Sequence, residues 1–324
     1  MERELTMEFA RVTEAAALAS ARWVGLGDKI AADNAAVEAM RAVFNTIHMK
    51  GTVVIGEGEM DEAPMLYIGE RLGDGDSPEL DVAVDPLEGT NSCANGVPGA
   101  IATVAVAKRG CLLHAPDMYM DKIAVGPAAA GKISLEAPVR ENIANVAKAL
   151  GKKAKDITVV ILDRPRHQKL ISDVRATGAR VRLITDGDIS PAVACTFDNS
   201  GVDMMLGIGG APEGVLAAAA LRCMGGEMQG RLWPEDDEDI ARAKALGIND
   251  VQKLLTMDDL VSADDVFFAA TGITEGSLLR GVTFTSGGAF THSVVIRGKT
   301  GTVRFIEAHH RFDKKPDYAI KGCC

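Results

Sequence analysis

The sequence predicts an α/β protein of two domains, built from layered helices and sheets. Three observations support this prediction. The chain has 324 residues, of which 47% are hydrophobic, so it can bury a large core and is long enough for two domains. Its first part combines alanine-rich helical stretches with short apolar strands. From about residue 156, apolar strands alternate with helical stretches, which is typical of parallel α/β packing. We therefore place the domain boundary between residues 155 and 156.

The chain begins with two predicted helices, residues 9–25 and 28–47, which are rich in alanine and other helix formers. Gly25 and Gly27 can end the first helix, and Asp28 can cap the second. Apolar segments bounded by Gly, Pro or Asp then predict three strands. These strands cover residues 52–57, 79–85 and 99–109.

The second part of the chain alternates strand and helix. The predicted strands cover residues 157–162, 180–185 and 202–210, and the predicted helices cover residues 167–178, 188–196 and 212–226. The last sixty residues are expected to form a strand meander with glycine turns. Its strands cover residues 267–273, 280–286, 289–298 and 301–310.

Composition excludes several classes of protein. The formal net charge is −10 and the sequence pI is about 5.2, which argues against a protein that follows nucleic acid phosphates over a broad surface. A local cationic pocket remains compatible with this charge. The N-terminus lacks the basic-then-apolar pattern of a signal peptide. No segment approaches the roughly 18 apolar residues of a membrane span. We expect a soluble, cytoplasmic protein with no nucleic acid or membrane partner.

The cysteines predict no metal or redox motif. They are Cys93, Cys111, Cys195, Cys223, Cys323 and Cys324, and no pair has the C-x-x-C spacing. We interpret them as reduced, mostly structural thiols, with the last two in a frayed tail.

Isolated acids stand where predicted strands end. They are Glu57, Asp85, Glu88 and Glu213. In parallel sheets, the carboxyl ends of strands are where ligands bind. A fifth acid, Asp33, lies on a predicted helix one turn after Lys29, so these two side chains share a face. Any one of these acids also fits an ordinary turn former or helix N-cap.

The segment D-P-L-E-G-T, residues 85–90, is less easily explained as an ordinary turn. Pro86 is expected to stop the strand, and Gly89 permits a close approach of backbone to ligand. A helix beginning near Thr90 would direct free N–H groups at a phosphate. Carboxylates are the ligands that Mg²⁺ and Mn²⁺ prefer, and two such ions about 4 Å apart can hold both oxygens of a phosphoryl transfer.

These residues resemble those of a known family. D-P-L-E-G-T is similar to the signature of the lithium-sensitive, metal-dependent phosphatases, and longer segments resemble class II bacterial fructose-1,6-bisphosphatases. Those segments are VVIGEGEMDEAPMLYIGE, VDPLEGT, DRPRH, DGD, GIGGAPEGV, TGITEG and KTGTVRFIE. The resemblance implies an α-β-α-β-α sandwich of the sugar-phosphatase type with mixed sheets and an active site between two domains. Residues 1–155 would form the metal and phosphatase domain, and residues 156–324 the substrate-binding domain.

The resemblance also implies roles for individual residues. Asp33 and Glu57 would bind one metal, and Asp85, Glu88 and Glu213 a second, with two or more Mn²⁺ or Mg²⁺ ions per site. Thr90 would orient the attacking water, and Lys29 and Asp61 would take part in catalysis. In the mechanism that we predict, Asp33 accepts the proton of that water. The implied substrate contacts are Glu88, Gly89, Thr90, Tyr119, Arg164, Pro165, Arg166, Asp186, Gly187, Asp188 and Gly210.

Some of these substrate contacts also have a physical rationale of their own. Arg164 and Arg166 flank a proline just after a strand, so the turn can hold both guanidiniums toward the uncleaved phosphate. Asp186 and Asp188 suit hydrogen bonds to sugar hydroxyls. A solvated basic turn, an ordinary D-G-D turn and a packing role for Tyr119 are the alternatives.

The predicted function is hydrolysis of the 1-phosphate of fructose 1,6-bisphosphate, a gluconeogenic step, by a homo-oligomer, either dimer or tetramer. Two alternatives stay open. The enzyme could also hydrolyse sedoheptulose 1,7-bisphosphate, or the chain could be an inactive regulator that only binds phosphosugars. A water-orienting hydroxyl at Thr90 argues against the regulator, because binding alone does not need it.

Overall fold

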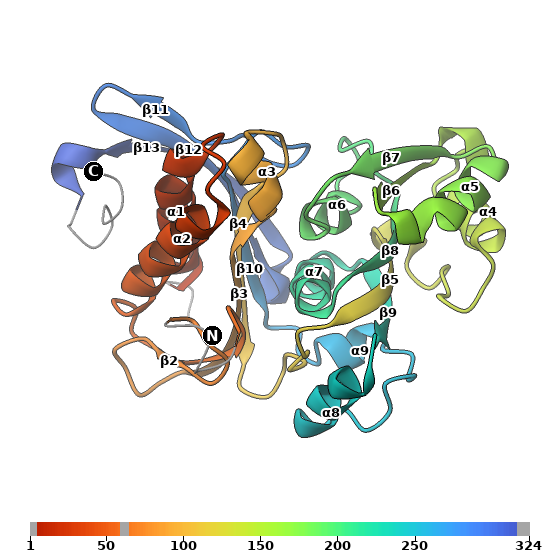
Figure 1. Ribbon diagram of the computed structural model, residues 1–324, viewed down its shortest axis with the longest axis horizontal. Helices are drawn as coiled ribbons and strands as arrows, with labels where there is room; N and C mark the ends of the chain where they lie inside the picture. The colour runs from red at the N-terminus through yellow and green to blue at the C-terminus, as the bar shows by residue number, and fades with distance from the viewer. Residues whose placement is uncertain (1–4, 59–64, 316–324) are drawn as a thin grey trace. The chain divides into compact units, whose positions relative to one another are not determined.

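The computed structural model describes residues 5–58 and 65–315. The chain divides into two compact units (Figure 1). The first comprises residues 1–112 and 263–324, and the second comprises residues 113–262. The predicted boundary at residue 155 falls inside the second unit. The predicted α/β class is confirmed, since each unit combines helices with one mixed sheet.

In the first unit, the sheet has the strand order β11-β12-β10-β4-β3-β1-β2, and β13 pairs with β12. Strands β1 and β3 are parallel, and the other pairs are antiparallel. The strands are β1 (Lys50–Ile55), β2 (Arg71–Leu72), β3 (Glu79–Glu88), β4 (Ile101–Lys108), β10 (Phe267–Gly272), β11 (Thr283–Thr285), β12 (Gly288–Arg297) and β13 (Thr302–Arg311). The helices are α1 (Leu5–Ser20), α2 (Lys29–Phe44) and α3 (Thr90–Asn95), with short 3-10 helices at Ala21–Trp23, Gly298–Thr300 and Phe312–Lys314.

Helices α1 and α2 lie side by side against the sheet of the first unit (Figure 1). Their alanine-rich faces are buried with the apolar residues of β3, β4 and β10 in one core. Phe9 of α1 meets Phe267 of β10 edge to face, with ring centroids 5.6 Å apart. Thr13 of α1 is linked through Thr271 of β10 to Ser293 of β12 by buried hydroxyl hydrogen bonds of 2.8 Å each. Small residues thus allow close packing, and these three buried hydroxyl groups are hydrogen-bonded to one another.

The second unit is a five-stranded sheet of order β7-β6-β8-β5-β9. Strands β6, β7 and β8 are parallel, whereas β5 is antiparallel to both β8 and β9. The strands are β5 (Tyr119–Val125), β6 (Thr158–Leu162), β7 (Arg180–Ile184), β8 (Met204–Gly210) and β9 (Glu227–Trp233). The helices are α4 (Val139–Ala149), α5 (Gln168–Ala176), α6 (Ile189–Ala194), α7 (Ala211–Met224), α8 (Asp237–Ala245) and α9 (Met257–Leu260), with 3-10 helices at Pro127–Ala129, Ala154–Asp156 and Pro165–His167.

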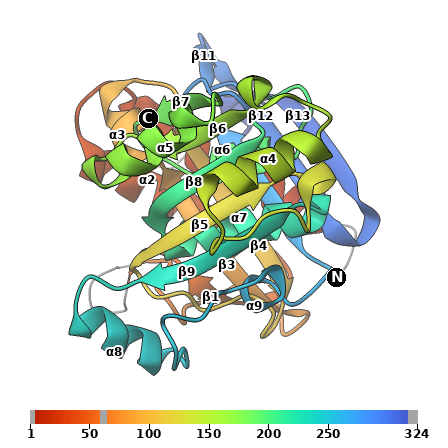
Figure 2. The same ribbon diagram turned by 90° about the vertical axis from the view of Figure 1, so that its right-hand side faces the viewer.

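Helices cover both faces of this second sheet. Figure 2 shows α4 and α5 on its near face, with α6 and α7 on the far face. Ile143 of α4 and Ile171 of α5 belong to the same buried cluster as Val159 of β6. Ala194 of α6 is buried on the other side with Val160. The two-sided cover agrees with the nearly continuous apolar sequence of β6.

Two long-range pairings explain why the compact units differ from the predicted domains. Strand β5 precedes residue 155, yet it hydrogen-bonds to β8 and β9. Strand β10 follows residue 262, yet it pairs with β4 near the start of the chain. The C-terminal meander therefore extends the first sheet, rather than belonging to the same unit as the parallel strands. Such pairings leave no local signal at the point where a unit begins.

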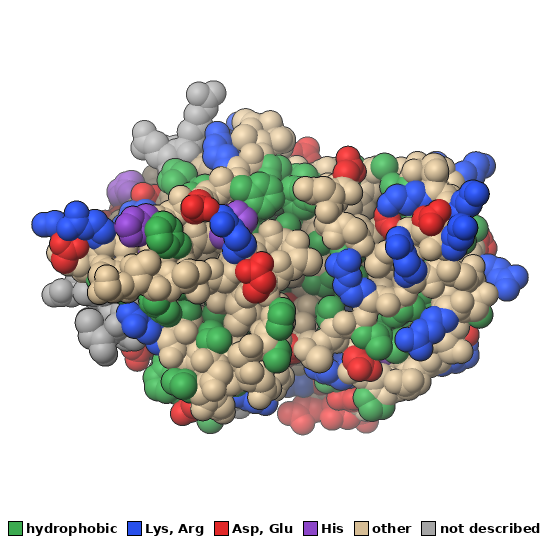
Figure 3. Space-filling view, turned by 90° about the horizontal axis from the view of Figure 1, so that it is seen from above, with side chains coloured by type: hydrophobic (Ala, Val, Ile, Leu, Met, Phe, Trp, Pro, Cys, Tyr) green, Lys and Arg blue, Asp and Glu red, His purple; other side chains and the backbone are tan. Residues whose placement is uncertain are grey.

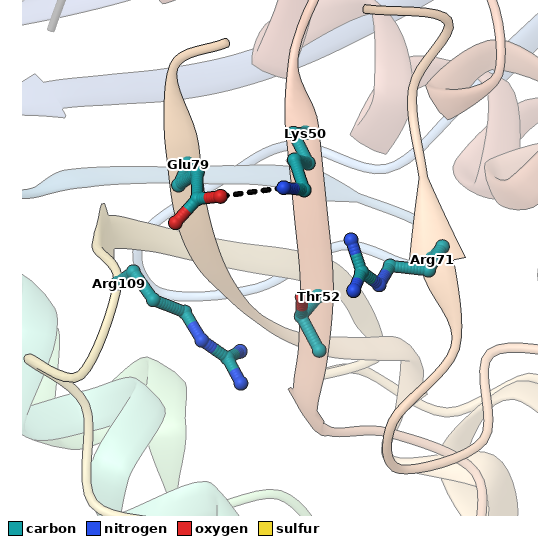
Figure 4. A pocket seen from close by; sticks show the side chains of 5 residues that line it. All are labelled: Lys50, Thr52, Arg71, Glu79 and Arg109. Carbon is teal, nitrogen blue, oxygen red and sulfur yellow. Dashed lines mark hydrogen bonds and ion pairs between the residues drawn. The ribbon is translucent and has the colours of Figure 1, made fainter. Parts of the chain in front are cut away.

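One edge of the first sheet carries a small polar cavity of about 70 Å³ (Figure 4). Lys50 Nζ lies 2.5 Å from Glu79 Oε1 there, and Arg109 pairs at 3.2 Å with the buried Asp81. Arg71 and Thr52 complete the lining. None of these residues is a predicted site residue, and the ion pairs already neutralise much of the local charge.

Within the described residues, no helix is long and apolar enough to cross a membrane. The four cysteines of this part of the chain, Cys93, Cys111, Cys195 and Cys223, are free thiols, as predicted. Cys323 and Cys324 lie outside the described residues.

Candidate active site

Acids of the first unit stand at the ends of two adjacent parallel strands. The register of β1 and β3 pairs Ile55 with Ala83. Glu57 lies two residues after Ile55, just beyond the end of β1, and Asp85 lies two residues after Ala83, within β3. Since the carboxyl ends of parallel strands meet at one edge of a sheet, this register directs both acids to the same edge.

The segment 85–90 has a defined local geometry. Asp85 accepts a hydrogen bond from the Leu87 amide at 3.1 Å. The pairing of β3 with β4 shifts register between Asp85 and Glu88. The prediction that Pro86 ends the strand is wrong, because β3 continues to Glu88. Pro86 instead occupies the irregularity, where a missing N–H removes no regular ladder bond. Carboxylate oxygens of Asp85 and Glu88 lie within 4.8 Å of each other.

Gly89 and Thr90 form the turn into α3, as predicted. Gly89 has a φ of 85°, and a Cβ there would lie only 3.3 Å from Ala100 Cα, so both conformation and space favour glycine. The Thr90 hydroxyl donates to Leu87 O at 3.2 Å. Because its hydrogen is used in this bond, its lone pairs remain as acceptors for a further donor, such as water.

Lys29 and Asp33 lie in the first turns of α2. Asp28 caps this helix by accepting from Ala31 N at 2.9 Å, as predicted. Lys29 donates a hydrogen bond to the side-chain oxygen of Asn91 in α3, which joins the start of α2 to the D-P-L-E-G-T turn. Burial raises the pKa of Asp33. Asp61 lies outside the described residues.

Glu213 belongs to the second unit, and so do the predicted substrate residues from Tyr119 onward. Apart from Tyr119, they lie at the carboxyl ends of its parallel strands. Arg164, Pro165 and Arg166 follow β6, Asp186, Gly187 and Asp188 follow β7, and Gly210 ends β8, with Glu213 after it. Tyr119 begins β5 and is paired in register with Gly210. The sheet thus brings four separate segments to one edge.

Specific contacts connect these segments. The Arg166 guanidinium lies over the Tyr119 ring, 4.5 Å from its centroid, and donates to Ile208 O at 2.9 Å. Arg164 lies 3.7 Å from Asp186 Oδ1. Arg166 is therefore held by a ring and a carbonyl, whereas Arg164 donates to Asp163 O at 3.2 Å and has only a long ion pair with a side chain.

Basic side chains gather over β7 and α5 in the same unit (Figure 3, right). Arg180 and Arg182 are exposed on β7, one strand away from the segment with Arg164 and Arg166. A chain of negative net charge thus presents a local positive surface, which attracts anionic ligands.

Two residues that sequence reasoning missed organise the second unit. Lys122 on β5 is fully buried and forms a 2.6 Å ion pair with Asp188. His167, also buried, accepts from the Ile208 amide at 2.8 Å. Neither residue has a local sequence signal, because its partners lie in other segments. His167 does lie in D-R-P-R-H, which is one of the segments that resemble the family.

The fold and these strand-end clusters define an α/β protein with carboxylates and basic side chains at the ends of its parallel strands. Residues 3–310 match the family model described as bacterial fructose-1,6-bisphosphatase, glpX-encoded. The chain is 48% identical over 328 aligned positions to fructose-1,6-bisphosphatase 1 class 2 of Escherichia coli K12, covering 97% of both chains. Fructose-1,6-bisphosphatase class 2 proteins of Escherichia coli O6:H1 and Shigella flexneri match to the same extent. This chain belongs to the bacterial, glpX-encoded fructose-1,6-bisphosphatase family.

Proposed function

We propose that this chain hydrolyses the 1-phosphate of fructose 1,6-bisphosphate to give fructose 6-phosphate and phosphate. Relatives with that activity in their names are 48% identical over 97% of the chain. The structural observation that supports the proposal is the parallel register of β1 and β3. From it we infer that Glu57 and Asp85 lie at one edge of the sheet, with Thr90 at the start of α3 just after β3. Acids in such a position suit phosphoryl transfer assisted by divalent cations.

We further propose that Asp33 and Glu57 hold one divalent cation, Mn²⁺ or Mg²⁺, and that Asp85, Glu88 and Glu213 hold another. The donor set fits hard cations, since every donor is a carboxylate oxygen. Glu213 Oε2 supports this fit, because it is buried and has no hydrogen-bond partner within the described residues. Bound there, such cations offset the negative charge of the transferred phosphoryl group.

The protein's own groups position the reactants. Thr90 Oγ1 keeps its lone pairs available for a water hydrogen, so we assign it the orientation of the attacking water. We assign to Asp33 the acceptance of the proton that the water releases. Lys29 adds positive charge and fixes the turn through Asn91. Asp61 is also assigned to catalysis, on the family resemblance alone.

The second unit supplies the substrate contacts in this proposal. Arg164 and Arg166 bind the phosphate that is not cleaved, because guanidiniums bind phosphate through charge-assisted, bidentate bonds. The segment 186–188 binds sugar hydroxyls. The other assigned contacts are Glu88, Gly89, Thr90, Tyr119, Pro165 and Gly210.

A phosphate-release assay tests the proposed function. The purified chain is given fructose 1,6-bisphosphate with Mn²⁺, with Mg²⁺, or with excess chelator. We expect turnover with at least one cation and none with chelator, restored when the cation is added back. Binding of fructose 1,6-bisphosphate without any phosphate release would indicate a regulator instead. The same assay with sedoheptulose 1,7-bisphosphate measures the breadth of substrate choice.

Three further assignments concern the cellular setting of the protein. We propose a cytoplasmic location, a role in gluconeogenesis and a homo-oligomer, either dimer or tetramer. Light scattering on the purified protein tests the last of these directly.

A further inference from the structure

Lys122 is a charged residue in the core of the second unit. Its side chain is fully buried in the middle of β5. The ammonium lies 2.6 Å from Asp188 Oδ2 and donates to Gly210 O at 2.8 Å. A buried ammonium costs several kcal/mol unless it is paired and hydrogen-bonded. The fold accordingly provides an acceptor from the segment before α6 and another from the end of β8.

The same ammonium also acts on Glu213 in the first turn of α7. Gly210, whose carbonyl oxygen accepts from the Lys122 ammonium at 2.8 Å, is also the residue against which the Glu213 carboxylate packs. One ammonium therefore pairs with Asp188 and lies at the same glycine as Glu213. Each carboxylate keeps one buried oxygen, Asp188 Oδ1 and Glu213 Oε2, without a hydrogen-bond partner in the described part of the chain. Unsatisfied buried acceptors are costly, and in a native protein they indicate a missing donor or cation.

Glycines of the segment G-I-G-G-A-P-E-G leave room for this arrangement. A Cβ at Gly209 would lie 2.0 Å from Asp188 Oδ2 and 3.0 Å from Lys122 Nζ. A Cβ at Gly210 would lie 1.8 Å from Glu213 Oε2, and one at Gly214 would lie 3.2 Å from Lys122 Cδ. The absence of a side chain at Gly209, Gly210 and Gly214 thus follows from the packing of one lysine and two acids.

We propose that Lys122 is a positioning residue for the substrate and metal contacts of the second unit. Its ammonium holds the Asp188 carboxylate in the orientation that binds a sugar hydroxyl, leaving Oδ1 for the ligand. It also offsets part of the charge of Glu213, so that this acid stays in place before a cation binds. This inference rests on the proposed function, in which Asp188 binds substrate and Glu213 binds metal.

A merely structural ion pair would have different consequences. Breaking it would lower stability, but the surviving folded protein would bind substrate with the parental affinity. A positioning residue acts through Asp188, so its effect on binding disappears when Asp188 has already lost its charge. The coupling between the two substitutions therefore separates the two roles.

The experiment compares Lys122→Met, Asp188→Asn and the double variant with the parent. Methionine keeps much of the length of lysine and removes its charge. We expect Lys122→Met to raise KM for fructose 1,6-bisphosphate at least 10-fold, with a smaller change in kcat. The Mn²⁺ concentration for half-maximal activity should rise as well. KM of the double variant should lie within a factor of two of that of Asp188→Asn. Calorimetric binding of fructose 6-phosphate in Mn²⁺ should show the same pattern.

Lys152→Met is the matched control. It breaks another ammonium–carboxylate pair of the same unit, at 2.5 Å from the buried Asp203, away from the predicted site residues. Its KM should stay parental. If Lys122→Met does not fold, the double variant can still be tested, because it removes both charges together. Its KM still has to match the KM of Asp188→Asn.

A parental KM for Lys122→Met, or fully multiplicative effects in the double variant, would overturn the inference. If the unsubstituted protein releases no phosphate from fructose 1,6-bisphosphate, the proposed function is wrong instead. In that case, the calorimetric comparison still decides whether Lys122 acts through Asp188.

Discussion

His167 accepts a hydrogen bond from the Ile208 backbone amide, with 2.8 Å between Nε2 and N. An acceptor Nε2 requires the neutral ring with its proton on Nδ1, and Nδ1 lies 2.7 Å from Leu162 O, its acceptor. Gly207, with a φ of 127°, leaves space for this ring, since a Cβ there would lie 3.0 Å from Nε2. One imidazole thus ties the segment after β6, which carries Arg164, to the end of β8.

Acidification should loosen this connection. Burial lowers the pKa of His167 from its ordinary value of 6.5, so the unfolded chain takes up a proton before the folded chain does. This contribution to stability is complete above pH 6.5 and decreases as pH falls toward the folded pKa. We expect KM for fructose 1,6-bisphosphate to rise below pH 6.5 in the parent. His167→Ala should have a higher KM than the unsubstituted protein at neutral pH, and that KM should change little below pH 6.5. Steady-state kinetics from pH 5 to 8 checks this, and an equal pH response in both proteins would contradict it.

Arg164 should contribute mainly to substrate binding. Its Nη1 donates to Asp163 O at 3.2 Å, but its ion pair with Asp186 is long, at 3.7 Å, so the donors on that side can turn to a phosphate. Arg164→Ala should weaken binding by about 1.5 to 3 kcal/mol, the loss of one charge-assisted bond. KM should rise accordingly, with a smaller fall in kcat, since remote binding energy also helps to orient the reacting end. Arg175→Ala, in α5, is the control for lost positive charge. Equal KM values for the two variants would mean that Arg164 is only a solvated turn residue.

Glu14 in α1 should make the protein less stable at high pH. It is buried, and burial raises its pKa to about 7. Because the folded state holds the proton more tightly, the stabilising contribution is present below pH 4.5 and is lost as pH rises through 7. A shift of this size corresponds to at most about 3 kcal/mol. Glu14→Gln should therefore gain unfolding free energy relative to the parent at pH 8 but not at pH 4. Glu8→Gln, on the same helix but paired with Arg11, should show no such difference. Denaturant unfolding at both pH values measures this.

Much of the fold was predictable because its signals are local. The strand in residues 79–85 is an apolar run, and Asp28 caps α2 as its type and position predict. Which strands pair with each other was not predictable from the sequence, since nothing near β10 indicates that it pairs with β4. The site shows the same contrast. Its strand-end acids could be predicted, because parallel strands direct such residues to one edge.

Lys122 shows the limit of sequence reasoning at the site. In the sequence it is one charged residue in an apolar strand, and its acceptor Gly210 lies 88 residues away. Only the paired register of β5 and β8 brings them together. Pro86 shows a second limit, since the usual strand-ending effect of proline is absent at a bulge.

The most direct test of the account is the kcat of Thr90→Ala. This substitution leaves Asp85, Glu88 and the other acids in place and removes the hydroxyl that donates to Leu87 O. If Thr90 orients the attacking water, kcat should fall by about 10² or more, while calorimetric substrate binding changes only a few-fold. Thr90→Ser, which keeps the hydroxyl, should recover much of the rate. A parental kcat in Thr90→Ala would contradict the account and leave Thr90 as merely the first residue of α3.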